Sequence, residues 1–273
     1  MTKQYFVRVI GDYGQLGDMA FAEVSDRLDA QLMDIPDAHF SVRLSSVPVF
    51  DTIATGFMLA QLAVNSPLGD RHIFYVNTAP RKDKAQARVD NEGEGLVYAK
   101  LKNGVRIVAV NSGYSLALIK PFTDSIRLIK VSAAGSQFRS RDNFPVAVGA
   151  IARGDESLLG DDVTHTVPDA LPKNAVVYTD GYGNLKCSID PKDLDAHHGE
   201  KVTVEINGRE QVAMVGTGIF AVADGEYCLA KGSSGWDLPD GSRMEFAEMV
   251  KRGGNASKSF GSPPGGIKVN WRS

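Results

Sequence analysis

The sequence is poor in cysteine and contains no long apolar run. Its 273 residues include two cysteines, Cys187 and Cys228, which lie far apart and form no CxxC pair. This spacing gives no reason to expect a disulfide framework, and we expect two free thiols in a reducing cytoplasm. No segment has the length and hydrophobicity of a signal peptide or a membrane-spanning helix. We therefore expect a cytoplasmic protein that does not engage a membrane.

An excess of charge of one sign is also missing. Lysine and arginine together number 30 against 33 acidic residues, which is a formal net charge of −3. Such a balance offers nothing to attract nucleic acid or anionic lipid, and we expect neither as a partner. The five histidines show no zinc-ligand spacing, and the adjacent pair His197-His198 lies in a polar stretch. No metal site is expected from this pattern.

Strand-like and helix-like segments alternate in the first part of the chain. Apolar or alternating runs predict strands at residues 5–10, 39–44, 72–76 and 125–131. Apolar residues at helical spacing predict helices at residues 18–32, 51–64 and 142–152. A hairpin of residues 96–101 and 105–110 is expected around Asn103-Gly104, a strong two-residue turn signal. This alternation predicts an α/β domain over residues 1–160, with a mostly parallel sheet flanked by helices.

The second part of the chain differs from the first in its composition and in its predicted elements. Residues 161–172 are polar, contain two prolines and are expected to form a linker. Short strand candidates follow, separated by turns, at residues 175–178, 201–206, 211–215, 219–222 and 227–230. This pattern predicts a small all-β, barrel-like domain over residues 173–273. Residues 237–252 are interpreted as an insertion, and the Gly-, Ser- and Pro-rich tail from Gly253 as irregular.

Three segments carry a resemblance to one enzyme family. They run from Ser136 to Asp142 (SQFRSRD), from Asp180 to Asn184 (DGYGN) and from Gly232 to Trp236 (GSSGW). Together they resemble the signature segments of the S-adenosylmethionine (SAM) hydroxide adenosyltransferases and of their relatives, the fluorinase and the chlorinase. The resemblance extends from Asp12 to about Ala256. It implies SAM as substrate, no separate cofactor, and a homotrimer whose site lies between the first domain of one subunit and the second domain of its neighbour.

In the first domain, the resemblance implies two residues that bind the nucleoside. Asp12 follows the first predicted strand and would hold the ribose hydroxyls, a role that suits an acidic side chain at the carboxyl end of a strand. Phe50, which precedes Asp51, resembles the first residue of a Trp-Asp pair that opens a helix. From its position alone, Asp12 could equally cap the next helix or a turn.

In the second domain, the resemblance centres on the segment from Asp180 to Asn184. Asp180 would pair with the methionine ammonium of SAM in a charge-assisted contact, Tyr182 replaces the family's Phe, and Asn184 would reach adenine. An ordinary turn is the alternative, and one turn could serve both purposes. Phe220 would stack on adenine, or else it is a core residue of a strand. The other contacts implied with the methionine carboxylate and adenine involve Ser233, Ser234 and Ala256.

The catalytic positions differ from the family pattern. Family hydrolases arrange an Asp, an Arg and a His around a water molecule. The resemblance places Asn77 at the Asp position and Arg139 at the His position, with Arg81, Lys84 or Arg88 as the Arg. An asparagine cannot act as a base, and an arginine does not release its proton.

Three hypotheses about the reaction therefore remain open. Water could displace methionine to give adenosine; a halide, which needs no deprotonation, could give a halogenated product; or the chain could bind SAM or adenosine without turnover. Phe138 to Arg141, which includes Ser140, resembles the segment by which the halogenases hold halide. Arg139 would repel the sulfonium unless a carboxylate intervenes, and Asp83 is the candidate. We expect Arg141 and Asp142 to form a salt bridge at the start of the following helix.

Overall fold

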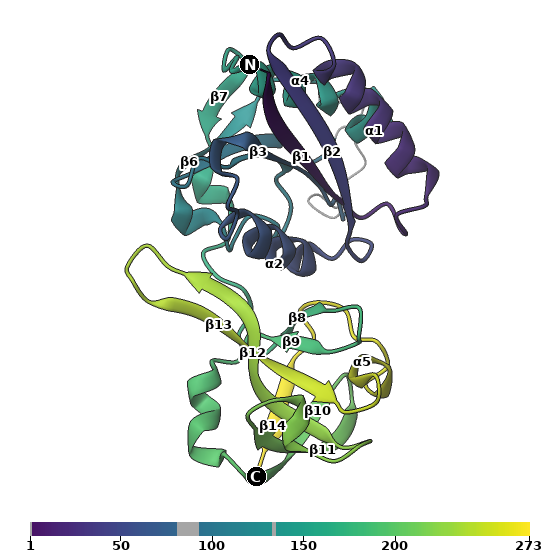
Figure 1. Ribbon diagram of the computed structural model, residues 1–273, viewed down its shortest axis with the longest axis vertical. Coiled ribbons are helices and arrows are strands. Elements are labelled where there is room, and N and C mark those ends of the chain that lie inside the picture. Colours follow the sequence, from purple (N-terminus) through teal and green to yellow (C-terminus); the bar gives the residue numbers. More distant parts are fainter. Residues whose placement is uncertain (1, 81–92, 133–134) are drawn as a thin grey trace. The chain divides into compact units, whose positions relative to one another are not determined.

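The computed structural model describes residues 2–80, 93–132 and 135–273. The chain divides into two compact units, Met1–Asp169 and Ala170–Ser273, each with its own sheet (Figure 1). Within these described residues, no helix is both long and apolar enough to span a membrane. Cys187 and Cys228 are buried free thiols, as the sequence analysis predicted.

The first unit is built on a mixed sheet with strand order β2-β1-β3-β5-β4-β6-β7 among the described residues. Its parallel part consists of β1 (Lys3–Gly11), β2 (Ala38–Ser46), β3 (His72–Asn77) and β5 (Arg106–Val110). Its antiparallel part adds β4 (Leu96–Leu101), β6 (Thr123–Ile129) and β7 (Leu159–Asp162). The predicted hairpin is confirmed, because β4 and β5 pair antiparallel around Asn103-Gly104.

The helices of the first unit begin and end where local chemistry dictates. The Asp18 side chain accepts the Ala20 N–H at the start of α1 (Met19–Leu32), and Asp51 does the same for Ala54 at the start of α2 (Thr52–Ala63). After the short α3 (Arg139–Asp142), α4 (Phe144–Arg153) ends at Gly154, whose φ of 77° favours glycine. The three helices expected from apolar spacing are therefore confirmed.

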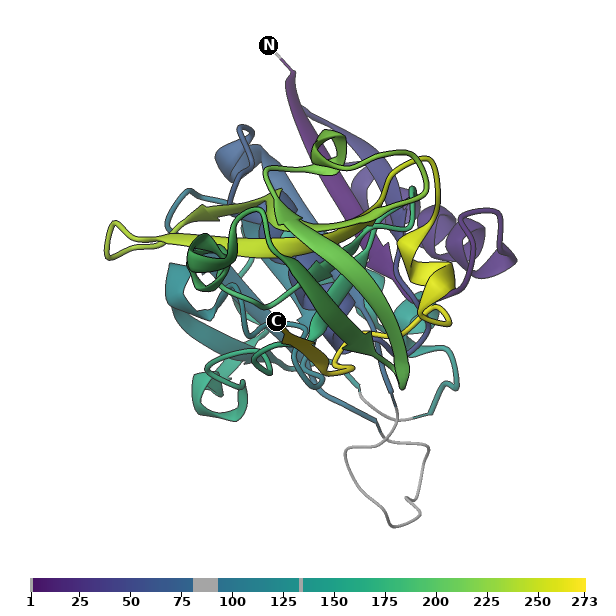
Figure 2. The ribbon, with the colours of Figure 1, turned by 90° about the horizontal axis from the view of Figure 1, so that it is seen from below.

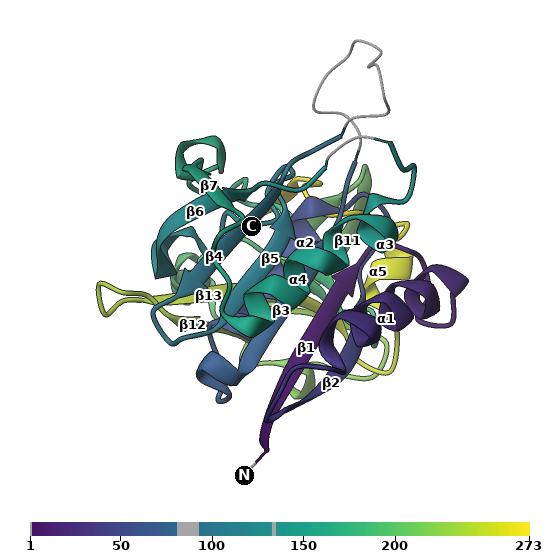
Figure 3. The same cartoon turned by 90° about the horizontal axis from the view of Figure 1, so that it is seen from above.

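One hydrophobic core of the first unit lies between one face of the sheet and two helices. Helices α1 and α4 lie side by side over β1 and β3 (Figure 3). Phe21 and Leu28 of α1 and Phe144 of α4 are fully or almost fully buried against Val7 and Val9 of β1. This packing holds β1 rigidly, and with it the residues that follow β1.

The second unit contains a curled sheet with strand order β14-β10-β11-β12-β13-β9-β8 among its residues, all of which are described. Strands β11 and β12 are parallel, whereas the other pairings are antiparallel. A bridge between Ala175 and Lys268 joins the two ends of the sheet. The strands are β8 (Val176–Thr179), β9 (Leu185–Cys187), β10 (Lys201–Ile206), β11 (Arg209–Gly216), β12 (Tyr227–Asp237), β13 (Arg243–Lys251) and β14 (Val269–Arg272).

The predicted fold class is wrong in both halves. The protein has two curled mixed sheets with few helices, not a helix-flanked parallel domain followed by a small all-β barrel. Residues 237–252, interpreted as an insertion, contain β13, which forms a long hairpin with β12 (Figure 2). Residues 219–222, predicted as a strand, form a 3-10 turn at Ile219–Ala221, and the supposedly irregular tail contains β14.

The charges of β13 explain why the sequence analysis did not indicate this strand. Strand β13 carries Arg243, Glu245 and Glu248, and such charges are unusual in a strand that has partners on both sides. Their charges are matched across the sheet, because Lys231 pairs with Glu245 and Lys186 with Glu248. Partners that lie so far apart in the sequence could not be recognised before the strands were paired.

Candidate functional site

The carboxyl edge of the parallel strands in the first unit brings Asp12 and Asn77 together. In the sheet, β1 lies between β2 and β3, so the chain leaves β1 toward one side and later returns past it to the other. Ligands of open α/β sheets bind outside the carboxyl ends of strands at such a divergence. Asp12 directly follows β1 and Asn77 ends β3, and the Asp12 N–H donates to the Asn77 carbonyl at 3.2 Å.

Phe50 lies beside Asp12 in a strained conformation. Its φ is 62°, a left-handed value that is uncommon for a bulky residue and typical of functional sites. Its N–H donates to Asp12 Oδ2 at 3.0 Å, and half of the residue is exposed (50%). Asp18, rather than Asp12, caps α1. Asp12 thus orders the loop before α2 while its carboxylate stays at the edge of the sheet.

Buried hydroxyls anchor the end of β3 under α2. Thr78 is buried, and its hydroxyl lies 2.8 Å from that of Thr55 on α2. Ser112 donates a hydrogen bond to the Thr78 carbonyl. These contacts fix the main chain next to Asn77, and they therefore hold in place the backbone from which the Asn77 side chain projects. The sequence analysis did not single out these hydroxyls.

The strain at Phe50 leads to a prediction. Replacing Phe50 with asparagine, which tolerates the left-handed region, should raise the free energy of unfolding by about 1 kcal/mol. Because the resemblance implies that residue 50 contacts SAM, the same variant should bind SAM more weakly, since it lacks the ring. Urea unfolding and calorimetry measure the two effects. Val49→Asn is the control, since Val49 is also exposed but does not have a left-handed backbone. Unchanged SAM affinity in Phe50→Asn would remove Phe50 from the site.

Ser140 lies in an aromatic environment that also contains the residue after Asp12. The Tyr75 hydroxyl donates to the Ser140 carbonyl at 2.7 Å, and Ser140 itself is buried. The Tyr13 ring contacts Phe138 edge-on, with 5.8 Å between centroids. Burial raises the pKa of both Tyr13 and Tyr75, so both phenols remain protonated at neutral pH. Residues 138–140 are therefore packed against the Asp12 loop.

The positive charge of Arg139 is paired with a carboxylate. It lies 3.8 Å from the carboxylate of Glu94 and donates to the Glu94 carbonyl at 3.0 Å. Both side chains are largely buried, and Gly93 leaves the space that the guanidinium occupies, since a Cβ there would lie 1.8 Å from it. Glu94 is a carboxylate that the sequence analysis missed. Four residues named in the sequence analysis, Arg81, Asp83, Lys84 and Arg88, lie outside the described residues.

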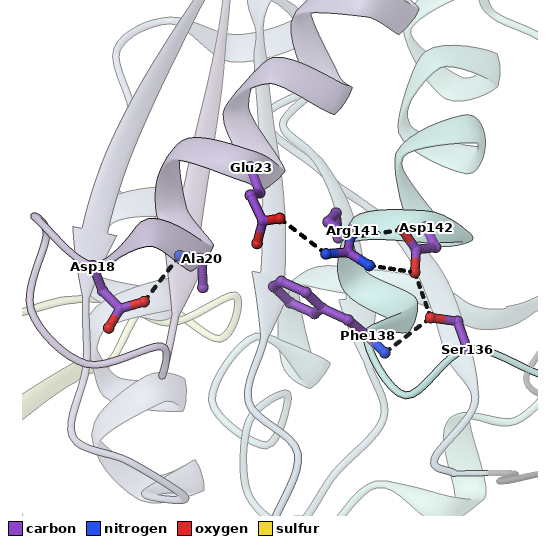
Figure 4. A network of polar contacts seen from close by, with 7 residues as sticks. All are labelled: Asp18, Ala20, Glu23, Ser136, Phe138, Arg141 and Asp142. Atoms are coloured by element: carbon purple, nitrogen blue, oxygen red, sulfur yellow. Dashed lines mark hydrogen bonds and ion pairs between the residues drawn. The ribbon is translucent and has the colours of Figure 1, made fainter.

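Arg141 and Asp142 form the predicted salt bridge, with an Nε–Oδ1 distance of 2.7 Å. Figure 4 shows Arg141 between Asp142 and Glu23 of α1, and Ser136 hydrogen-bonded to Asp142. The hydrogen bonds from Arg141 and Ser136 lower the pKa of Asp142 to about 2. This network ties α3 to α1 and assigns both residues a structural role.

In the second unit, the residues from Asp180 to Asn184 form a tight turn between β8 and β9. Asp180 Oδ1 accepts the N–H groups of Tyr182 at 2.9 Å and Asn184 at 3.0 Å, and Oδ2 accepts the Asn184 side-chain amide at 3.1 Å. The turn interpretation is therefore confirmed. Gly183, with φ 84°, accepts the Ser257 N–H at 2.8 Å, which places Ala256 and the short α5 (Ala256–Ser259) beside the turn.

The segment of Ser233 and Ser234 forms a β-bulge. The register of β12 against β13 shifts between Lys231 and Gly235, so Gly232, Ser233 and Ser234 face a single β13 residue. Bulges of this kind often occur beside active sites because they redirect side chains and interrupt the ladder. Gly232 lies against Glu248, since a Cβ at Gly232 would be 2.5 Å from the Glu248 Oε1 atom.

Glu248 connects this bulge with the Asp180 turn. Its carboxylate binds the Lys186 ammonium, which lies 4.0 Å from Asp180 Oδ2. The structure thus brings together Asp180, Asn184, the bulge and two charged residues that the sequence analysis missed, Lys186 and Glu248. A Lys inside a short strand and a Glu inside a supposed insertion left no signal by which to find them.

Two aromatic candidates of the second unit are strongly exposed. Tyr182 is 83% and Phe220 is 85% exposed, so the core alternative for Phe220 is wrong. Exposed rings of this size are available to a ligand or a partner. The guanidinium of Arg252 lies 5.6 Å from the Phe220 ring centroid. The contacts described above join Tyr182, but not Phe220, to the Asp180 turn.

Comparison with known proteins identifies the fold alone. No family model matches the chain, and no curated protein matches it. A crystal structure of an uncharacterized conserved protein from Thermotoga maritima is similar, with a TM-score of 0.69 and 18% identity, over 98% of this chain and 100% of that one. A conserved hypothetical protein from Thermus thermophilus gives a TM-score of 0.66 and 20% identity over the same shares. At such identities the likeness establishes a shared fold over nearly the whole chain.

Proposed function

We propose that the protein binds SAM and cleaves its C5′–S bond with water, giving adenosine and methionine. The observation that carries this proposal is the strained, half-exposed Phe50 beside Asp12 at the divergence of β1 and β3. A carboxylate there can accept both ribose hydroxyls, and an aromatic ring can cover the face of a nucleoside. The flanking motifs resemble those of SAM-cleaving enzymes, and on this ground we propose that the nucleoside is SAM.

The proposed reaction requires the protein mainly to orient the water relative to the C–S bond. Methionine leaves a sulfonium as a neutral thioether, so no acid is required, and the attacking water must be held in line with the C–S bond. The proposal assigns the orientation of this water to Asn77 and Ser140, two buried residues with side chains that can form hydrogen bonds. The reaction consumes SAM and water and yields adenosine, methionine and one proton, which passes to solvent.

The pairing of Arg139 favours water over halide. A bare arginine beside the sulfonium would attract an anion and oppose the substrate, whereas Arg139 lies against the carboxylate of Glu94. Glu94 thereby fills the role first considered for Asp83. A halogenase thus becomes the weaker alternative, and binding of SAM or adenosine without turnover is the other.

Product analysis separates these hypotheses. The purified protein is incubated with SAM, with and without chloride, and the products are resolved by chromatography. We expect adenosine in both samples. A chloride-dependent appearance of 5′-chloro-5′-deoxyadenosine would make the protein a halogenase, and binding without any product would make it a SAM-binding protein. Failure to bind SAM at saturating concentration would overturn the proposal. Asp12→Ala is the matched variant and should lose both binding and product.

The proposal includes a cytoplasmic homotrimer, in which the first unit of one subunit and the second unit of its neighbour share the ligand. The support is the resemblance, together with the division of the implied contacts between two separately packed units.

A further inference from the structure

Four residues of the second unit lie in one row across four adjacent strands. Lys186 of β9 pairs with Tyr178 of β8 on one side and with Glu248 of β13 on the other, and Glu248 pairs with Ala230 of β12. Directly opposed residues in neighbouring strands project to the same face. Lys186 and Glu248 therefore point to one side of the sheet, next to the turn that carries Asp180.

The charges of Lys186, Glu248 and the adjacent Asp180 do not balance. Asp180 and Glu248 supply two carboxylates, and Lys186 supplies one ammonium that binds Glu248 and lies 4.0 Å from Asp180 Oδ2. The group therefore carries one net negative charge. Lys186 is 8% exposed, and an ammonium has three N–H donors, of which Glu248 accepts one. Such a group suits a ligand that carries one cationic and one anionic group and has a net positive charge.

The methionine end of SAM has this composition. It carries an α-ammonium and an α-carboxylate on one carbon, and the sulfonium makes the whole ligand a cation. Asp180 offers its Oδ2 atom to the ammonium, and the neighbouring Lys186 offers N–H donors to the carboxylate.

We propose that Lys186 is a specificity-determining residue that binds the α-carboxylate of the ligand, and that Glu248 positions it. This inference rests on the proposed function, because it assumes that the SAM amino-acid end occupies this face. Lys186 lies outside the contacts that the three motifs imply. In this proposal it selects sulfonium compounds that carry an amino-acid group. Ligands that keep the ammonium and the sulfonium but lack the carboxylate should not depend on Lys186.

Calorimetry with two ligands tests this inference. SAM and decarboxylated SAM differ in the carboxylate alone. In Lys186→Met, the affinity for SAM should fall by about tenfold or more, whereas the affinity for decarboxylated SAM should stay the same or rise. Lys186→Arg, which keeps the charge, should recover part of the SAM affinity. Lys231→Met, which removes an exposed lysine of β12, is the control and should change neither.

The outcomes are distinguishable from failure of the proposed function. If the wild-type protein binds neither ligand, the proposed function fails, and this inference falls with it. If the wild type binds both equally well, or if Lys186→Met weakens both equally, Lys186 has a structural role and the inference is overturned. Because Lys186→Met leaves Glu248 without this cation, Lys186→Met/Glu248→Gln provides an uncharged pair. The double variant should show the same selective loss of SAM affinity.

Discussion

Replacement of Asp180 with asparagine is expected to weaken SAM binding by about a hundredfold. A hydrogen-bonded ion pair between a carboxylate and the ligand ammonium contributes about 2–3 kcal/mol when it is shielded from water. Asparagine preserves the Oδ1 acceptor that receives the Tyr182 and Asn184 N–H groups and loses only the Oδ2 acceptor of the Asn184 side-chain amide, so the turn should persist. Its neutral amide, however, cannot attract an ammonium. Calorimetry measures the affinity.

The control for Asp180→Asn is Asp193→Asn, because Asp193 is an exposed aspartate of the same unit. It should bind SAM with the affinity of the wild type. That result would show that the loss of one negative charge does not by itself cause the weaker SAM binding of Asp180→Asn. Adenosine, which lacks the amino-acid end, should bind Asp180→Asn with unchanged affinity. An unaltered SAM affinity in Asp180→Asn would remove Asp180 from the site.

Replacement of Gly183 with alanine is expected to lower the free energy of unfolding by about 3 kcal/mol. The residue has a φ of 84°, where a side chain costs about 1–2 kcal/mol. A Cβ there would also lie 2.2 Å from the Asn255 side chain, which must move. Asn255 accepts the Lys258 N–H at the start of α5, so its displacement disturbs that helix as well.

Gly181→Ala is a matched control in the same turn. A Cβ at Gly181 would meet no atom within 4 Å, and the Gly181 backbone is not left-handed, so this replacement should change stability by less than about 0.5 kcal/mol. Urea unfolding of the two variants measures the difference. Equal stabilities would show that the turn relaxes around a side chain at position 183. Gly183→Ala should also weaken SAM binding, because the turn presents Asp180.

The proposed ligand-binding residues follow the family resemblance more closely than the proposed catalytic residues do. At the positions that the resemblance implies, Asp12, Asp180 and Asn184 keep side chains that can bind the ligand, whereas Asn77 and Arg139 differ from the expected catalytic Asp and His. The Glu94 carboxylate beside Arg139 offsets the charge that this replacement introduces. We infer that any reaction here depends on orientation of the nucleophile rather than on its deprotonation by these two residues.

Local sequence determined the helices, the turns and the first strands. Asp18, Asp51 and Gly154 define helix ends through their own side chains or backbone freedom, and Asn103-Gly104 defines a hairpin. Each of these signals acts within a few residues, so a linear reading finds it. The ends of β1 and of the β8–β9 turn, which carry Asp12 and Asp180, could be placed in the same way.

Only the tertiary structure decided the sheet order and the charged partners. Strands β7, β13 and β14 are stabilised by pairing with distant segments, and their charged or irregular sequences do not indicate strands. Glu94 meets Arg139 from 45 residues away, and Lys186 meets Glu248 from 62 residues away. The sequence alone therefore determined the elements with strong local signals and the positions of Asp12 and Asp180 at the ends of such elements. Folding decided which charges neighbour them, because an ion pair depends on distance in space rather than along the chain.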